Sequence, residues 1–454
     1  MEKSINKMGT MPVNKLMLTL GAPMIISMVL QAVYNIVDSA FVSNMQDTGE
    51  MALNALTLAF PIQMLMVAVS IGTGVGTNAL LSRCLGMGDS KKAARVGGNA
   101  MFLAIIIYVL CLIFGIFGVG VYIGTQTTNS QIYDMATDYL RICSVISMGI
   151  VFFSIFEKML QATGLSLYST VAQITGAVIN IILDPIMIYG LFGFPQMGVK
   201  GAALATIISQ GVSCLWVLKF LTGKKTVLKI RLKNLALDGK IVTSVLSLGV
   251  SPFIMQATEC LIQLTFNNGM LKYGNDLYVA LMSILFSLTQ LIWMPLNGFS
   301  QGAQPVIGYN YGAKRFDRVK KAFKLQFTVS ICFSLFAVAL VEVFPTAFLK
   351  MFTNDQELID IGINSTRLFF AGMSVMGAQC ACQQTFLALG EAKISMFLAC
   401  LRKIILLFPL ALILPNIANM GVWGLLLAEP VSDVVAASCT TIMFTIRSRK
   451  ILKQ

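Results

Sequence analysis

The sequence contains no histidine, and only 12% of its 454 residues are charged. The missing histidine excludes imidazole metal sites, histidine general bases and histidine proton relays, so any handling of protons or cations must use carboxylates. A soluble domain carries about a quarter charged residues. The low share found here indicates that most of the chain does not face water.

Sequence motifs of several enzyme classes are also missing. The chain has no Walker A sequence, and its ten cysteines are scattered without a C-x-x-C pair. The glycines at 72, 74 and 76 follow no strand and precede no Lys-Ser/Thr pair, which excludes a phosphate loop. We therefore expect no enzyme activity and no bound cofactor, and we interpret the cysteines as buried reduced thiols.

Apolar runs long enough to cross a ~30 Å hydrocarbon core dominate the chain instead. The first run lacks a short apolar core followed by a small-residue cleavage site, so we interpret it as a retained span rather than a signal peptide. The twelve predicted spans are 16–43, 53–82, 96–122, 134–160, 165–190, 199–221, 241–270, 276–307, 319–345, 359–388, 392–415 and 421–446.

The net charge of +13 is distributed unequally between the two sets of loops. Basic residues gather at 3–15, 83–95, 219–240, 314–324 and 447–453, whereas the opposite loops hold Arg141, Lys200, Lys272, Lys350 and Arg367. The positive-inside rule then places both termini in the cytoplasm, as an even number of spans requires. The positive charge is explained by topology, and nucleic-acid binding is not needed to account for it.

The two halves of the chain repeat each other. Leu20-Gly21-Ala22-Pro23 returns as Leu248-Gly249-Val250-Ser251-Pro252, and Gly72, Gly76 and Gly86 return 226 residues later as Gly298, Gly302 and Gly312. Six spans per half is an even number, so both halves enter the membrane in the same orientation and a pseudo-twofold axis runs along the membrane normal.

The predicted fold is therefore an all-α membrane protein of twelve transmembrane helices in two pseudo-twofold-related six-helix lobes. We expect an N-terminal lobe over 1–221, a basic cytoplasmic linker over 222–240 and a C-terminal lobe over 241–454. Prolines at 23, 61, 185, 252, 295, 305, 409 and 430 fall in or beside spans and predict bends or breaks in them.

Acidic residues inside the apolar spans are the main candidates for function, because a charge at the bilayer centre costs about 3 kcal/mol. Asp38 lies late in the first span and Asp184 in the fifth, with Asn180 four residues before Asp184 on the same helix face. With a hydroxyl such as that of Thr206, these side chains offer only oxygen ligands. Such a set suits sodium, or a proton shared by two carboxylates.

Four other acids fall in or near spans. Glu259, well inside the seventh span, is a candidate for attracting a cationic substrate, and Glu157 near the end of the fourth is a second choice. Glu429 and Asp433 lie one turn apart in the last span, where structural pairing remains an alternative to function. The adjacent Arg402 and Lys403 are expected to extend to the cytoplasmic interface.

Several of these segments together resemble the multidrug and toxic compound extrusion (MATE) transporters. The resemblance covers nearly the whole chain and rests on the segments Gly21-Ala-Pro23, Tyr34-Asn-Ile-Val-Asp38, Asn180-x-x-x-Asp184-Pro185, Met197-Gly-Val-Lys-Gly-Ala-Ala203 and Gly308-Tyr-Asn-Tyr-Gly-Ala313.

The resemblance implies two six-helix lobes around a V-shaped cavity, and export of amphipathic, often cationic drugs against an inward flow of sodium or protons. In one branch of the family the coupling ion is held at positions that match Asp38, Asn180, Asp184 and Thr206, with Tyr34 beside them. Other branches add an acid in the tenth span. The corresponding stretch here, Met376–Cys382, contains none.

Two alternatives remain beside a drug exporter. A flippase for a lipid-linked precursor, from the same superfamily, would need several cationic residues in its cavity, but the basic residues here lie mostly in cytoplasmic loops. An intramembrane enzyme is the second alternative, but the chain contains no histidine, no Walker A sequence and no C-x-x-C pair. We expect a multi-pass monomer of the plasma membrane, in contact with lipid and with small amphipathic substrates.

The predicted topology is testable by labelling. In a Lys229→Cys variant the new thiol lies in the basic linker, so a membrane-impermeant maleimide added to intact cells should label it only after the membrane is permeabilised. Ready labelling of intact cells would contradict the topology.

Overall fold

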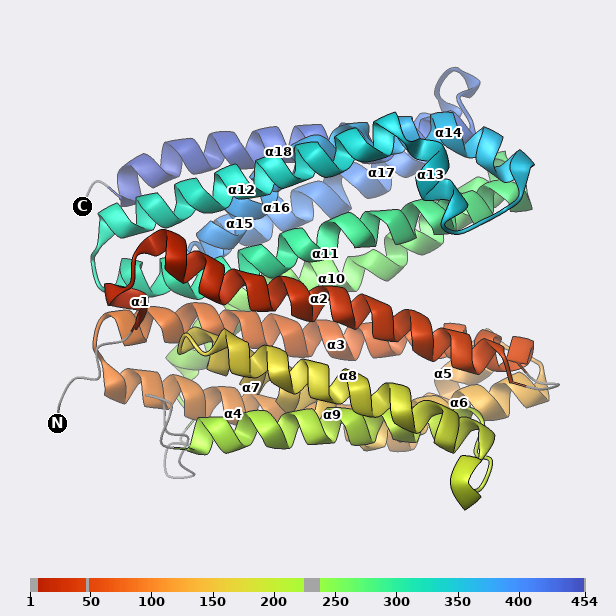
Figure 1. Cartoon of the computed structure of the whole chain (residues 1–454), viewed down its shortest axis with the longest axis horizontal. Coiled ribbons are helices and arrows are strands. Elements are labelled where there is room, and N and C mark those ends of the chain that lie inside the picture. The colour runs from red at the N-terminus through yellow and green to blue at the C-terminus, as the bar shows by residue number, and fades with distance from the viewer. Residues whose placement is uncertain (1–6, 46–48, 224–236, 453–454) are drawn as a thin grey trace.

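The computed structural model describes residues 7–45, 49–223 and 237–452, and these residues are helical almost throughout (Figure 1). Ten helical segments are long and apolar enough to cross a membrane, and a bent pair, α6 and α7, makes an eleventh. The remaining predicted span, the tenth in chain order, is divided by a 3-10 turn into α14 and α15, so neither piece is long enough by itself.

The first half of the chain begins with a short helix that precedes its six spans. Its elements are α1 (Lys7–Thr10), α2 (Val13–Ser43), α3 (Gly49–Gly86), α4 (Ser90–Ile113) continued by the π-helical turn η1 (Phe114–Gly118) and α5 (Val119–Gln126), α6 (Ser130–Val145), α7 (Met148–Ala162), α8 (Ser166–Tyr189), η2 (Leu191–Gly193) and α9 (Val199–Thr222).

The second half repeats this order with more interruptions. Its elements are α10 (Gly239–Tyr273), α11 (Asp276–Gly312), α12 (Phe316–Val343), α13 (Pro345–Lys350), α14 (Gln356–Phe370), η4 (Ala371–Val375), α15 (Met376–Leu389), α16 (Ala392–Cys400), η5 (Leu401–Leu407), α17 (Phe408–Ile413), η6 (Leu414–Asn419) and α18 (Val422–Ile451). All twelve predicted spans are found, and the fold prediction is confirmed.

Prolines are poor markers of where these spans break. Helices α2, α3, α8, α10, α11 and α18 all continue through an internal proline. The 47° bend between α6 and α7 lies at Ile146-Ser147, where there is no proline. Neighbouring helices, side chains and local adjustments re-satisfy the backbone groups that a proline frees, so a proline does not by itself end a span.

Repeated glycines bring the two halves together. A Cβ on Gly76 of α3 would overlap the backbone carbonyl of Val245 on α10, and a Cβ on Gly302 of α11 would overlap Gly21 on α2. Because glycine has no side chain, the helix backbones approach each other directly at these points. Each close approach has a counterpart in the other half, as a pseudo-twofold axis requires.

The same symmetry holds at the ends of these helices. A Cβ on Gly86 would meet the Tyr309 carbonyl, and one on Gly312 would meet the Arg83 carbonyl. Tyr309 stands 226 residues after Arg83, the spacing of the glycine repeat. The duplicated glycines therefore form the seam between the halves, which we call the glycine seam: Gly21, Gly72, Gly76, Gly86, Gly249, Gly298, Gly302 and Gly312.

The halves meet mainly at the end of the molecule that carries both termini. In Figure 1, helices α2 and α11 lie against each other at that end, on the left, and diverge toward the other. Arginines add to the contact: Arg83 Nη1 donates to the Leu389 carbonyl (3.2 Å), and Arg318 Nη2 donates to the carbonyls of Met8 (3.2 Å) and Met11 (2.7 Å).

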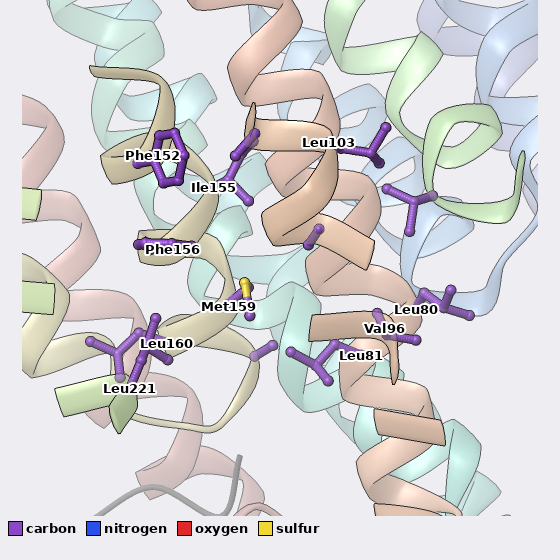
Figure 2. Close-up of a cluster of buried hydrophobic side chains, with 14 of the residues drawn as sticks. Leu80, Leu81, Val96, Leu103, Phe152, Ile155, Phe156, Met159, Leu160 and Leu221 are labelled. Atoms are coloured by element: carbon purple, nitrogen blue, oxygen red, sulfur yellow. The ribbon is translucent and has the colours of Figure 1, made fainter. Parts of the chain in front are cut away.

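A hydrophobic cluster holds α3, α4, α7 and α9 of the first half together and extends to α10 of the second half (Figure 2). Phe152, Ile155, Phe156 and Met159 of α7 are its centre, and Phe152 and Phe156 contact each other edge to face with ring centroids 5.5 Å apart. The bend before α7 thus leads into a firmly packed helix.

Residues 224–236 of the predicted linker, including Lys229, lie outside the described residues, and the lobe boundaries stay a prediction.

A methyl group introduced into the glycine seam should destabilise the protein. Gly76→Ala forces α3 away from α10, which we expect to cost about 1–3 kcal/mol and to lower the thermal unfolding midpoint in detergent. Gly211→Ala on α9 is the matched control, because a Cβ added there would meet no atom within 4 Å. Equal midpoints for the two variants would contradict the packing at the seam.

Candidate functional site

The two predicted intramembrane aspartates lie on neighbouring helices of the first half. Asp184 is fully buried on α8, and Asn180, one turn earlier, donates from Nδ2 to its Oδ1 at 3.2 Å. Asp38 lies on the last third of α2, which packs along α8. The carboxyl groups of Asp38 and Asp184 interact directly, and the hydroxyl of Tyr34 interacts with both.

Several oxygens of this cluster have no hydrogen-bond partner among the described residues. Asp38 Oδ1, Asn180 Oδ1 and Asp184 Oδ2 are buried and accept no hydrogen bond from any described residue. An unpaired buried acceptor is costly, and a pair of close carboxylates more so. The three oxygens are hard ligands, of the kind that bind sodium, and a proton between the carboxylates would also satisfy them. The donor set therefore fits the small cation that the sequence predicts.

Three further side chains belong to this cluster and were missed from the sequence. Tyr139 and Cys143 of α6 interact with Asp38, and Gln63 of α3 donates from Nε2 to the Tyr139 hydroxyl at 3.2 Å. Gln63 does carry a signal, as an amide inside an otherwise apolar span. Tyr139 lies among polar residues past the middle of α6, so its orientation toward Asp38 could be found only from the packing.

Thr206 is not drawn into the cluster. It lies on α9, which packs against α8, but its hydroxyl makes no hydrogen bond to any described residue. A role of this hydroxyl in cation binding stays a prediction.

The second-choice substrate acid, Glu157, is paired. It is buried on α7 with its Oε2 3.9 Å from the Nζ of Lys158, while Gln161 Nε2 donates to its Oε1 at 2.9 Å. Lys158 Nζ also donates to Gln301 Oε1 on α11, at 2.5 Å. This ion pair therefore links the first half to the second, and it is not the solvated acid that the position near a span end suggests.

The second half holds a larger group of buried charges, which we call the C-half network: Glu259, Arg402, Lys403, Glu429 and Asp433. Lys403 Nζ lies 2.8 Å from Glu259 Oε2. Arg402 Nη2 lies 2.8 Å from Asp433 Oδ1 and 3.4 Å from Glu429 Oε1. The expectation that both cations extend to the interface is wrong, since Arg402 is 7% and Lys403 6% exposed.

Local backbone geometry explains how two adjacent cations are both buried. The α-helix of the eleventh span changes at Leu401 into the π-helical turn η5, which contains both residues. Such turns are rare and often occur at functional sites. Ser432 Oγ donates to the Arg402 carbonyl at 3.0 Å, and the guanidinium lies 5.6 Å from the Trp293 ring centroid. The carboxylates of α10 and α18 provide the negative charges that neutralise these two cations, which hydrocarbon cannot do.

Arg402 should be far more important for stability than an exposed arginine. Arg402→Met leaves the carboxylate of Asp433 buried without its cation, at a cost of about 3–5 kcal/mol. The control is Arg447→Met, because the Arg447–Glu391 pair is half exposed and pairs of that kind contribute at most about 1 kcal/mol. Thermal unfolding in detergent measures both. Similar losses in the two variants would show that the buried network is not paired as described.

Comparison with known proteins agrees with this architecture. The sequence profile of the MatE family matches residues 23–186 and 252–413, one match in each half. The multidrug export protein MepA of Staphylococcus aureus (strain MSSA476) is 24% identical over 452 residues, covering 96% of this chain and 95% of MepA.

Solved structures show the same fold. The outward-facing conformation of a multidrug resistance MATE family transporter has a TM-score of 0.91 at 23% identity and covers 99% of both chains. The MATE multidrug transporter DinF-BH, solved as a complex with a bound compound, has a TM-score of 0.89 at 32% identity and covers 98% of both. Because profile, relatives and structures agree over nearly the whole length, the chain belongs to the MatE family of multidrug and toxic compound extrusion transporters.

Proposed function

We propose that the protein is a secondary active multidrug exporter that expels amphipathic, often cationic compounds by antiport with sodium or protons. The observation that carries this proposal is the group of three buried oxygens without partners on Asp38, Asn180 and Asp184. The names of the relatives support the substrate class: MepA is a multidrug export protein, and DinF-BH is a multidrug transporter.

Coupling follows from the cost of leaving the two aspartates unneutralised. No described Lys or Arg interacts with Asp38 or Asp184, so their like charges repel until a cation enters. A bound sodium ion or proton removes this repulsion and allows α2 and α8 to close around it. A ligand shifts a conformational equilibrium only by its differential affinity for the two states. Export results when the cation favours one orientation of the halves and the drug favours the other.

Recognition of cationic substrates is assigned first to Glu259 and second to Glu157. Each acid already has a lysine partner, Lys403 and Lys158 respectively. The side chain of Glu259 is 29% exposed, against 5% for that of Glu157. A cationic drug must therefore displace an ammonium group, and Glu259 is the more accessible of the two.

A lipid flippase is less well supported by the same charges. The described membrane-spanning segments do contain three buried cations: Lys158, and also Arg402 and Lys403, which the sequence assigned to the interface. Each of them is paired with a carboxylate. A pyrophosphate would have to compete with these acids, so the pairing favours cationic or neutral substrates.

The proposal includes the setting of the transporter. We propose that it acts as a monomer in the plasma membrane, with lipid around it and both termini and the 222–240 linker in the cytoplasm, the linker joining lobes 1–221 and 241–454. The glycine seam, which lies toward the termini, would then hold the halves together at the cytoplasmic side and separate there when the transporter changes orientation.

The coupling site is tested by neutralising its acids. Asp38→Asn should abolish gradient-driven drug flux into or out of proteoliposomes, while equilibrium drug binding in detergent stays within about two-fold of wild type. Asp184→Asn should do nearly the same, and the double variant should be little worse than either, because the two residues act as one unit. Sodium and pH gradients are imposed separately, so the experiment also identifies the coupling ion.

Asp138→Asn is the matched control. Asp138 forms an exposed ion pair with Lys200 at 2.9 Å, outside the acid cluster, and its loss should leave flux unchanged. Wild-type flux in Asp38→Asn would rule out this site as the seat of coupling.

A further inference from the structure

The charges of the C-half network do not balance. Its three acids, Glu259, Glu429 and Asp433, face two cations, Arg402 and Lys403, and electrostatic interactions connect all five. Among the described residues, the other titratable side chains that interact with the network are two thiols, Cys380 toward Arg402 and Cys260 toward Glu259. If every group were ionised, the network would carry one negative charge inside the membrane, where an uncompensated charge is strongly unfavourable.

The geometry identifies the acid that carries the excess charge. Glu259 and Asp433 each lie 2.8 Å from a cation, whereas Glu429 Oε1 lies 3.4 Å from Arg402. Glu429 is 8% exposed, and its Oε2 is buried with no hydrogen-bond partner among the described residues. Glu429 is thus the one acid of the three with both a long ion pair and an unused oxygen.

We propose that Glu429 holds an exchangeable proton on Oε2, so that the C-half network is a second proton site, separate from the Asp38–Asp184 pair. A metal cation would bind less well at this site than a proton, because it needs several oxygen ligands and would lie beside the positively charged Arg402 guanidinium. A proton needs one oxygen and leaves the network at two positive and two negative charges. When the proton leaves for water, Glu429 becomes a competitor of Asp433 for Arg402.

This second site changes what the transporter can couple to. A proton lost from Glu429 alters the pairing between η5 and α18, two elements that contact each other along the eleventh and twelfth spans. The site belongs to the half that lacks an acid in the tenth span, and Glu429, which carries its proton, is not among the positions that the family resemblance implies. Its existence does not depend on the proposed export activity, and it is testable without substrate.

The test is difference infrared spectroscopy of the full chain in liposomes, with a pH step, following the carbonyl stretch of protonated carboxylic acids. Wild type should show a component that Glu429→Gln removes entirely. Asp433→Asn should remove the same component although Glu429 is intact, because two acids then face two cations and Glu429 ionises to pair with Arg402. Asp38→Asn should leave this component in place, which separates it from any proton on the aspartate pair.

Glu429→Gln and Asp433→Asn each test the proposal independently, so one suffices if the other does not fold. Persistence of the full component in a folded Glu429→Gln or Asp433→Asn protein would overturn it. Loss of the component in Asp38→Asn but in neither of these variants would assign the buried proton to the first half alone, and would overturn the proposal equally. An unaltered drug flux in Asp38→Asn would bear on the coupling proposal and not on this one.

Discussion

Hydrocarbon cannot hydrogen-bond, and this constraint governs every part of the molecule. Backbone groups in the spans must be satisfied within helices, which is why the described residues are helical almost throughout. Charged side chains in the spans must find partners of opposite charge or lose their charge. Lys158, Arg402 and Lys403 each lie within 4 Å of a carboxylate, and the thirteen excess positive charges of the chain are left to the loops.

The two halves share one fold but differ in how their buried charged side chains are neutralised. The first half places Asp38 and Asp184 together with no cation in contact among the described residues, and leaves three oxygens open to an external ion. The second half surrounds two cations with three acids and is close to neutral. The two halves therefore share the backbone and the glycine seam, while their polar side chains differ: an aspartate pair with no cation beside it among the described residues in one half, and an ion-pair network in the other.

At the glycine seam the helix backbones of the two halves approach each other directly. Beside it, Leu16, Met17 and Leu20 of α2 share one buried hydrophobic cluster with residues of α11 such as Phe299 and Val306. Polar links such as Lys158 to Gln301 and Arg318 to the α1 carbonyls lie across or near the same region. A change of charge at either half can act on this seam because α2 and α3 carry both the seam glycines and residues of the Asp38 cluster.

The sequence by itself determined the twelve spans, the duplication and the identity of the main acids. Every predicted boundary lies within six residues of the observed one, because span length and apolar character are imposed by the membrane and are local properties of the chain. Asn180 and Asp184 could likewise be paired from their spacing alone, since residues four apart share a helix face.

Only the tertiary structure decided which charges meet. Arg402 and Glu429 are 27 residues apart and Lys403 and Glu259 are 144 apart, so no local pattern reports their contact. The π-helical turn that directs Arg402 and Lys403 inward, the bend at Ile146-Ser147 and the contact of Tyr139 with Asp38 depend in the same way on neighbouring helices. Hydropathy reports whether a residue is tolerated in the membrane, and the packing of distant helices determines what it touches there.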